Sequence, residues 1–174
     1  SEEGLEAVRT AQRSGQTVYA ETCPHYLTFT DEVYRRPDGR LFTVIPPIRK
    51  ETHRLSLWQA LEDGTLSCIG SDDAMRTVAE KQQGDSFDQI PMGLPGIGTR
   101  LPILYSEGVA RGRLPITRLA DLLATGPARI FGLYPKKGVI APGSDADLVL
   151  LDPTVRRTIR LADLHLPNDY TIYE

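Results

Sequence analysis

The chain has 174 residues, a formal net charge of −3 at pH 7 and a hydrophobic fraction of 40%, as expected for one globular domain. Its acidic balance gives no indication of nucleic-acid binding, since nucleic-acid binders show basic patches, and no apolar run reaches the roughly 18 residues that span a bilayer. The opening residues show no signal peptide and no initiator Met, so we expect a cytoplasmic protein in a chain that is not a complete gene product.

Helix and strand patterns alternate at the start of the chain. Apolar residues at a spacing of three predict a helix over residues 3–14 that ends at Gly15. Residues 17–23 are rich in β-forming types and predict a strand that ends at Pro24. A helix followed closely by a strand is half of a βα repeat.

The next segment is irregular and leads to a second helix. Residues 25–50 show no clean periodicity, and the extended run over 42–45 stops at two prolines. Residues 52–62 return to helical spacing. The apolar face of this helix is expected to consist of Leu55, Trp58 and Leu61.

A short apolar run over residues 66–70 predicts a buried parallel strand, and two carboxylates follow it at Asp72 and Asp73. In barrel and doubly wound folds, chemistry lies at the C-terminal end of such strands. A carboxylate there can bind a metal or act as a general base. The alternative is that either residue only caps the next helix. Cys23 and Cys68 both lie in strand-like runs, so we expect two buried thiols without a disulfide.

The second half of the chain contains loops, helices and then strands. The polar residues 76–88 predict a loop at the rim of the site, and residues 90–96, rich in Pro and Gly, suit either a wall against a ligand or a plain turn. Helices are expected over 97–111 and 115–123, with a break at 125–127.

The pattern changes near residues 133–137, where we place a domain boundary. Strands are expected over 138–141, 148–151 and 155–159. A β segment of about 37 residues is too small to close a core alone, so it should need partners from elsewhere.

Six short segments, in order along the chain, resemble signatures of the dihydropyrimidinases and hydantoinases, cyclic amidohydrolases of the amidohydrolase superfamily. Each match is weak alone, but the series is specific and covers nearly the whole chain. The segments are Glu21–Leu27 (ETCPHYL), Pro46–Arg49 (PPIR), Gly70–Asp72 (GSD), Ile90–Gly93 (IPMG), Ala128–Gly132 with Lys137–Val149 (ARIFG and KGVIAPGSDADLV), and Asp169–Glu174 (DYTIYE).

The resemblance implies an α/β fold: the C-terminal part of a (β/α)8 TIM barrel over residues 1–135, then part of a small β-sandwich over residues 136–174. It also implies an enzyme that opens a hydantoin or dihydropyrimidine ring to an N-carbamoyl amino acid with two zinc ions. The family holds these ions with an HxH pair, a carboxylated Lys, two further His and an Asp after the eighth strand. Only that Asp, Asp72, is expected in this chain, with roles as metal ligand and general base, and we expect the chain alone to be inactive.

Other positions depart from the family pattern. Asp73 stands where relatives usually have His, and we expect it to act as a helix cap. His25 stands where many hydantoinases have Gln, which indicates a structural role or hydrogen bonding at the rim. By resemblance, backbone groups at Ile45, Met92 and Gly93 contact the substrate ring; the alternative is that Ile45 and Met92 only pack, which we expect for Ile45.

Two other functions remain open. Gly93–Thr99 (GLPGIGT) is reminiscent of a dihydroorotase stretch, so a dihydroorotase or an allantoinase is one alternative. A non-catalytic dihydropyrimidinase-like assembly protein, such as the collapsin response mediator proteins, is the other. Expected partners are a small cyclic amide and further copies of the chain, or a complementary chain carrying the rest of the barrel, but neither nucleic acid nor a membrane.

Overall fold

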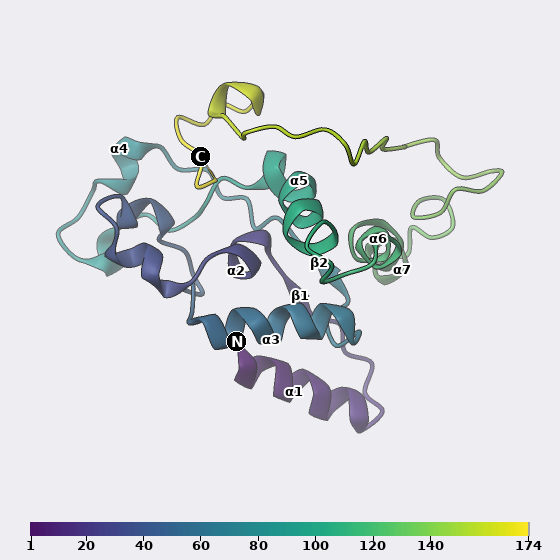
Figure 1. Cartoon of the computed structure of the whole chain (residues 1–174). Coiled ribbons are helices and arrows are strands. Elements are labelled where there is room, and N and C mark those ends of the chain that lie inside the picture. The colour runs from purple at the N-terminus through teal and green to yellow at the C-terminus, as the bar shows by residue number, and fades with distance from the viewer. Residues whose placement is uncertain (174) are drawn as a thin grey trace.

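The computed structural model describes residues 1–173 and is built around two short parallel strands (Figure 1). Strand β1 (Glu21–Thr22) pairs with β2 (Cys68–Ile69), with Glu21 opposite Cys68 and Thr22 opposite Ile69. In Figure 1, α1 (Glu2–Arg13) and α3 (Glu51–Glu62) lie below the strands, α5 lies above them, and α6 and α7 lie to their right. The remaining helices are α2 (Pro24–Thr28), α4 (Val78–Lys81), α5 (Arg100–Leu104), α6 (Ile116–Ala120) and α7 (Gly126–Ile130).

The parallel pairing places the C-terminal ends of both strands at one edge. Both strands were predicted, but they are shorter than the β-rich runs that contain them, because backbone pairing covers only two residues of each run. Helix α3 lies between them in the chain, as a parallel crossover requires.

Helix α1 confirms the first predicted helix. The Ser1 Oγ accepts a hydrogen bond from the Gly4 N–H at 3.2 Å and caps the first turn. Leu5 is buried in the main core. Gly15 follows the helix in a left-handed conformation, with φ +81°, which glycine adopts without a steric penalty.

Helix α3 confirms the second predicted helix but corrects its buried face. Trp58 and Leu61 are buried as expected, whereas Leu55 is exposed and Leu57 is buried in its place. The Trp58 Nε1–H donates to the Leu27 backbone oxygen at 2.9 Å. This contact turns α3 toward α2, which the spacing of apolar residues alone could not show.

Helices α5, α6 and α7 form two longer helical stretches that contain π turns. Helix α5 continues into a π turn over Tyr105–Val109, and α6 runs through a π turn over Asp121–Thr125 directly into α7. The predicted break at residues 125–127 is therefore wrong. A Cβ atom at Gly126 would lie 2.7 Å from the Ser67 oxygen, so this glycine permits close packing and does not end the helix.

Residues 133–160 form an arm without strands, which Figure 1 shows looping away from the body and returning across its top. The strands expected over 138–141, 148–151 and 155–159 are therefore wrong for this chain. A strand needs a hydrogen-bonding partner, and Leu148, Val149 and Leu150 are exposed here. Assignment of 136–174 to a β-sandwich stays a prediction, and Glu174 lies outside the described residues.

The chain end returns to the body after the arm. Tyr170 and Ile172 are buried in a second core cluster with Phe42 and Leu94. None of the helices in the described part of the chain is both long and apolar enough to cross a bilayer.

Candidate functional site

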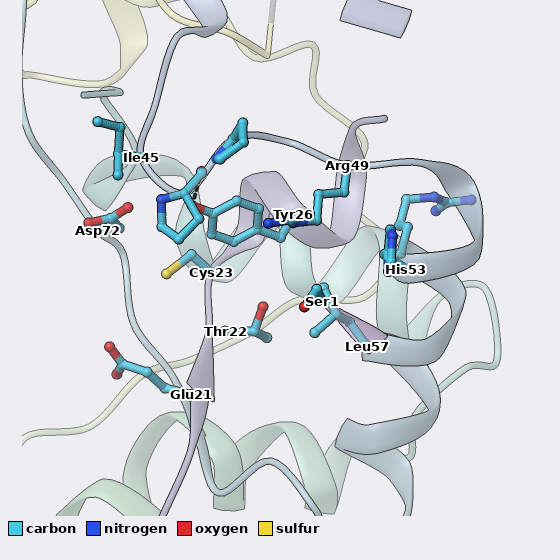
Figure 2. Close-up of a pocket in the computed structure, with 13 residues that line it drawn as sticks. Ser1, Glu21, Thr22, Cys23, Tyr26, Ile45, Arg49, His53, Leu57 and Asp72 are labelled. Atoms are coloured by element: carbon cyan, nitrogen blue, oxygen red, sulfur yellow. Dashed lines mark hydrogen bonds between the residues drawn. The ribbon is translucent and has the colours of Figure 1, made fainter. Parts of the chain in front are cut away.

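A cavity of about 350 Å³ opens beside the C-terminal ends of β1 and β2 (Figure 2). Glu21 and Cys23 reach it from β1 and the residue after it, Asp72 from the segment after β2, and Ile45 from the loop before α3. Figure 2 shows the carboxylates of Glu21 and Asp72 on one side of the cavity and Arg49 on the other. The cavity therefore has an acidic wall facing a basic one.

Asp72 stands in a strained backbone position at this acidic wall. Its φ is +52°, in the left-handed region that few residues other than glycine adopt. Its side chain is 45% exposed. Partial burial, and then the negative charge of Glu21, raise the pKa of the Asp72 carboxyl above its usual value. The strand end thus presents a carboxylate to the cavity, while the roles of Asp72 as metal ligand and general base stay a prediction.

His25 is held behind Asp72 with one ring nitrogen unpaired. The imidazole is 2% exposed, and its Nε2 has no hydrogen-bond partner among the described residues. That nitrogen lies 3.8 Å from the Asp72 Oδ2. Burial lowers the pKa of His25 to about 4, so the ring is neutral near pH 7. The buried position agrees with the predicted structural role.

Cys23, His25 and Asp72 together form a cluster that sequence reasoning missed. Their donor atoms all lie within 4.8 Å of one another. Sulfur, imidazole nitrogen and carboxylate oxygen are the donors that zinc accepts, so the residues present fit a divalent cation. Burial, and then the charges of Asp72 and Glu21, raise the pKa of the Cys23 thiol to about 12. The available signal was that Cys23 ends one predicted strand and Asp72 follows the next predicted parallel strand.

The two cysteines are free and buried, as predicted. Cys68 Sγ lies 3.8 Å from the Glu21 Oε2, to which it donates a hydrogen bond.

Asp73 turns away from the cavity, but the expectation that it caps the next helix is wrong, because Thr77 caps α4. Its Oδ1 accepts hydrogen bonds from the backbone N–H groups of Gly96 at 2.7 Å and Ile97 at 3.0 Å. These groups open the 3-10 turn over Ile97–Thr99, a distant segment of the chain. Asp73 also pairs with Leu94 in a parallel bridge.

Replacing Asp73 by alanine leaves the Gly96 and Ile97 N–H groups without their acceptor. We expect the free energy of unfolding to fall by about 1–2 kcal/mol. Asp73→Asn keeps a carbonyl oxygen at the same place, and we expect less than half of that loss. Equilibrium urea unfolding of both variants measures the difference, and equal losses would contradict the role of Asp73 as acceptor for the Gly96 and Ile97 N–H groups.

The residues predicted to contact the substrate do not line the same cavity. Ile45 is 70% exposed and lines the cavity, so the expectation that it only packs is wrong. Met92 faces a second hollow of about 330 Å³, and its backbone oxygen accepts from the Arg76 Nε–H at 3.2 Å. The Gly93 N–H donates to the Thr43 oxygen at 3.1 Å. Substrate contacts at Ile45, Met92 and Gly93 stay a prediction.

Comparison with known proteins gives consistent matches over nearly the whole chain. Residues 7–170 match the profile of the amidohydrolase family. The D-phenylhydantoinase of Escherichia coli O81 (strain ED1a) is 39% identical over 174 residues, covering 98% of this chain and 38% of that protein. The chain thus spans about 38% of the length of the curated relatives it matches.

Solved structures agree with the sequence matches. A D-hydantoinase crystal structure superimposes with a TM-score of 0.96 at 38% identity, covering 99% of this chain and 38% of that one. The dihydropyrimidinase from Brevibacillus agri NCHU1002 gives 0.94 at 40% identity, covering 98% and 38%. These matches confirm the predicted resemblance and the predicted α/β fold class, as part of a barrel hydrolase.

Proposed function

This chain belongs to the amidohydrolase family, and from that premise we propose that it is part of an enzyme that hydrolyses a cyclic amide. The proposed reaction opens a hydantoin or dihydropyrimidine ring to an N-carbamoyl amino acid. The observation that carries it is the Asp72 carboxylate, which meets the cavity at the end of β2. D-hydantoinases and a dihydropyrimidinase among the relatives support this substrate class.

Asp72 has two proposed tasks. Asp72 would be one of the residues that hold a pair of zinc ions, and these ions when bound would supply a water of lowered pKa as the nucleophile. Its carboxylate takes the proton of that water and returns it to the leaving ring nitrogen. Partial burial beside Glu21 favours this work, because it raises the pKa of the carboxyl toward that of a useful base.

Residues near Asp72 shape the cavity. The Tyr26 hydroxyl donates to the Pro46 oxygen at 2.7 Å and fixes the loop that presents Ile45. Ile45 then offers apolar surface beside the carboxylate, where a flat ring can lie. Arg49 on the opposite wall suits the polar edge of a ureide.

The activity is proposed for the intact protein that contains these residues. Of the ligand set that the family resemblance implies, the chain contributes Asp72. We expect the 174-residue chain alone to bind zinc more weakly than micromolar and to leave hydantoin intact. Calorimetric titration and a hydrolysis assay test both expectations.

Micromolar zinc binding by the chain alone would contradict this proposal. A Cys23→Ser variant would then show whether the cluster of Cys23, His25 and Asp72 is responsible, because a serine hydroxyl is a poor zinc ligand.

Substrate competition separates the proposal from its alternatives. Turnover of hydantoin by the intact protein, with little turnover of dihydroorotate or allantoin, supports it. Preference for dihydroorotate would favour the role suggested by Gly93–Thr99, and absence of both zinc and hydrolysis would favour a non-catalytic assembly protein. The exposed apolar residues of the arm support association with further copies or with a complementary chain, and two free thiols suit a cytoplasmic setting.

A further inference from the structure

We propose that Lys81 is a positioning residue whose buried ammonium joins the loop that carries Ile45 to the segment that carries Met92 and Gly93. The contacts stand by themselves, while the consequence for substrate binding rests on the function proposed above. Lys81 ends helix α4 and lies outside the cavity that contains Asp72.

Lys81 is unusually placed for a lysine. Its side chain is 0% exposed, and no carboxylate in residues 1–173 forms an ion pair with it. Burial, and then the charge of Arg76, lower the pKa of Lys81 to about 8. Burying a cation without an ionic partner costs stability. The hydrogen bonds that the Lys81 ammonium makes are therefore the contacts that hold it in this position.

Those hydrogen bonds all go to Thr43. The Lys81 Nζ donates to the Thr43 backbone oxygen at 2.7 Å and to its Oγ1 at 2.9 Å. The same backbone oxygen accepts from the Gly93 N–H at 3.1 Å. The Thr43 hydroxyl in turn donates to the Arg40 oxygen at 2.9 Å. Thr43 therefore joins segments that are far apart in the chain.

The Arg40 side chain also binds α4 and the residues that follow it. Its Nε–H donates to the Lys81 backbone oxygen at 3.0 Å, and its Nη2 donates to the Gly84 oxygen at 2.8 Å. Lys81 thus reaches from α4 to Thr43, and Arg40 reaches back from the Thr43 segment to α4. We call the group of Arg40, Thr43, Lys81 and Gly93 the Lys81 junction.

The Lys81 junction reaches the proposed site along two short paths. On one side, Thr43 lies two residues before Ile45, which lines the cavity. On the other, Gly93 precedes Leu94, whose oxygen accepts from the Ala74 N–H at 3.0 Å, two residues after Asp72. A shift at the junction would move the wall of the cavity relative to the carboxylate.

The test compares three variants of the intact protein. Lys81→Met removes the ammonium and keeps an unbranched chain of similar length. Thr43→Val removes only the hydroxyl, and serves where Lys81→Met does not fold. Lys136→Met makes the first substitution at an exposed lysine and is the matched control. The readouts are amide hydrogen exchange at residues 43–45 and 93–94, zinc content, and KM and kcat for hydantoin.

We expect Lys81→Met to raise KM about tenfold with kcat within about threefold and zinc content unchanged. Amide exchange should accelerate at residues 43–45 and 93–94, while amides in α1 and α3 change little. Thr43→Val should show the same pattern more weakly, and Lys136→Met should match the parent protein.

Uniformly faster exchange throughout the protein, or unchanged exchange and KM, would overturn the positioning role. Localised exchange in a protein that hydrolyses no cyclic amide would support the junction and place the failure with the proposed function.

Discussion

Asp72→Asn in the intact protein is expected to lower kcat/KM for its cyclic amide by about 10³-fold or more. The amide cannot take up the proton of the attacking water and is a weaker metal ligand than a carboxylate. Steady-state kinetics together with elemental analysis of zinc measure the loss and show how much of it comes from the metal.

Asp73→Asn is the matched control for this experiment. The two acids are adjacent, but the Asp73 carboxylate is occupied by the Gly96 and Ile97 N–H groups and does not face the cavity. Its amide variant should keep kcat/KM within about threefold of the parent value. Retention of more than a tenth of the activity by Asp72→Asn would remove Asp72 from its catalytic role.

Gly93→Ala is expected to lower the free energy of unfolding by about 3 kcal/mol. Gly93 has φ +129°, and a Cβ atom there would lie 2.5 Å from the Ala74 oxygen. Relief of this overlap would separate the segment after Asp72 from the segment that carries Met92. Urea unfolding and KM measurements should therefore change together.

Gly15→Ala separates backbone strain from the overlap. Gly15 also has a positive φ, +81°, but nothing lies within 4 Å of a Cβ atom built there. We expect this variant to lose only about 1 kcal/mol. Equal losses for the two alanine variants would show that the approach of Ala74 has no energetic consequence.

The sequence predicted those parts of the fold that local rules determine. Helices α1 and α3 follow from apolar spacing and from a following glycine, and Asp72 was placed by a buried run that ends at Gly70. The short helix α4 was also readable, because Thr77 and Glu80 form a capping box whose spacing is a known start signal, but we predicted only a loop there.

Long-range contacts explain what the sequence could not provide. Gly126 looks like a helix stop, yet it is there because α7 approaches Ser67. The cluster around His25 and the burial of Lys81 depend on residues more than thirty positions away. The expected strands after residue 137 need partners, and the pairing of a strand cannot be read from the strand alone.

The contacts of Asp73 and Ala74 with Leu94 have an evolutionary consequence. They hold the two ends of the intervening segment together, and Arg40 holds the backbone oxygens of Gln83 and Gly84. Residues 85–89, all exposed, therefore form a tip beyond these contacts. Insertions or deletions in this tip leave these contacts intact, so the carboxylate of Asp72 keeps its position. Related enzymes can therefore differ in the length and sequence of this tip, at the rim of the site, while their catalytic residues stay the same.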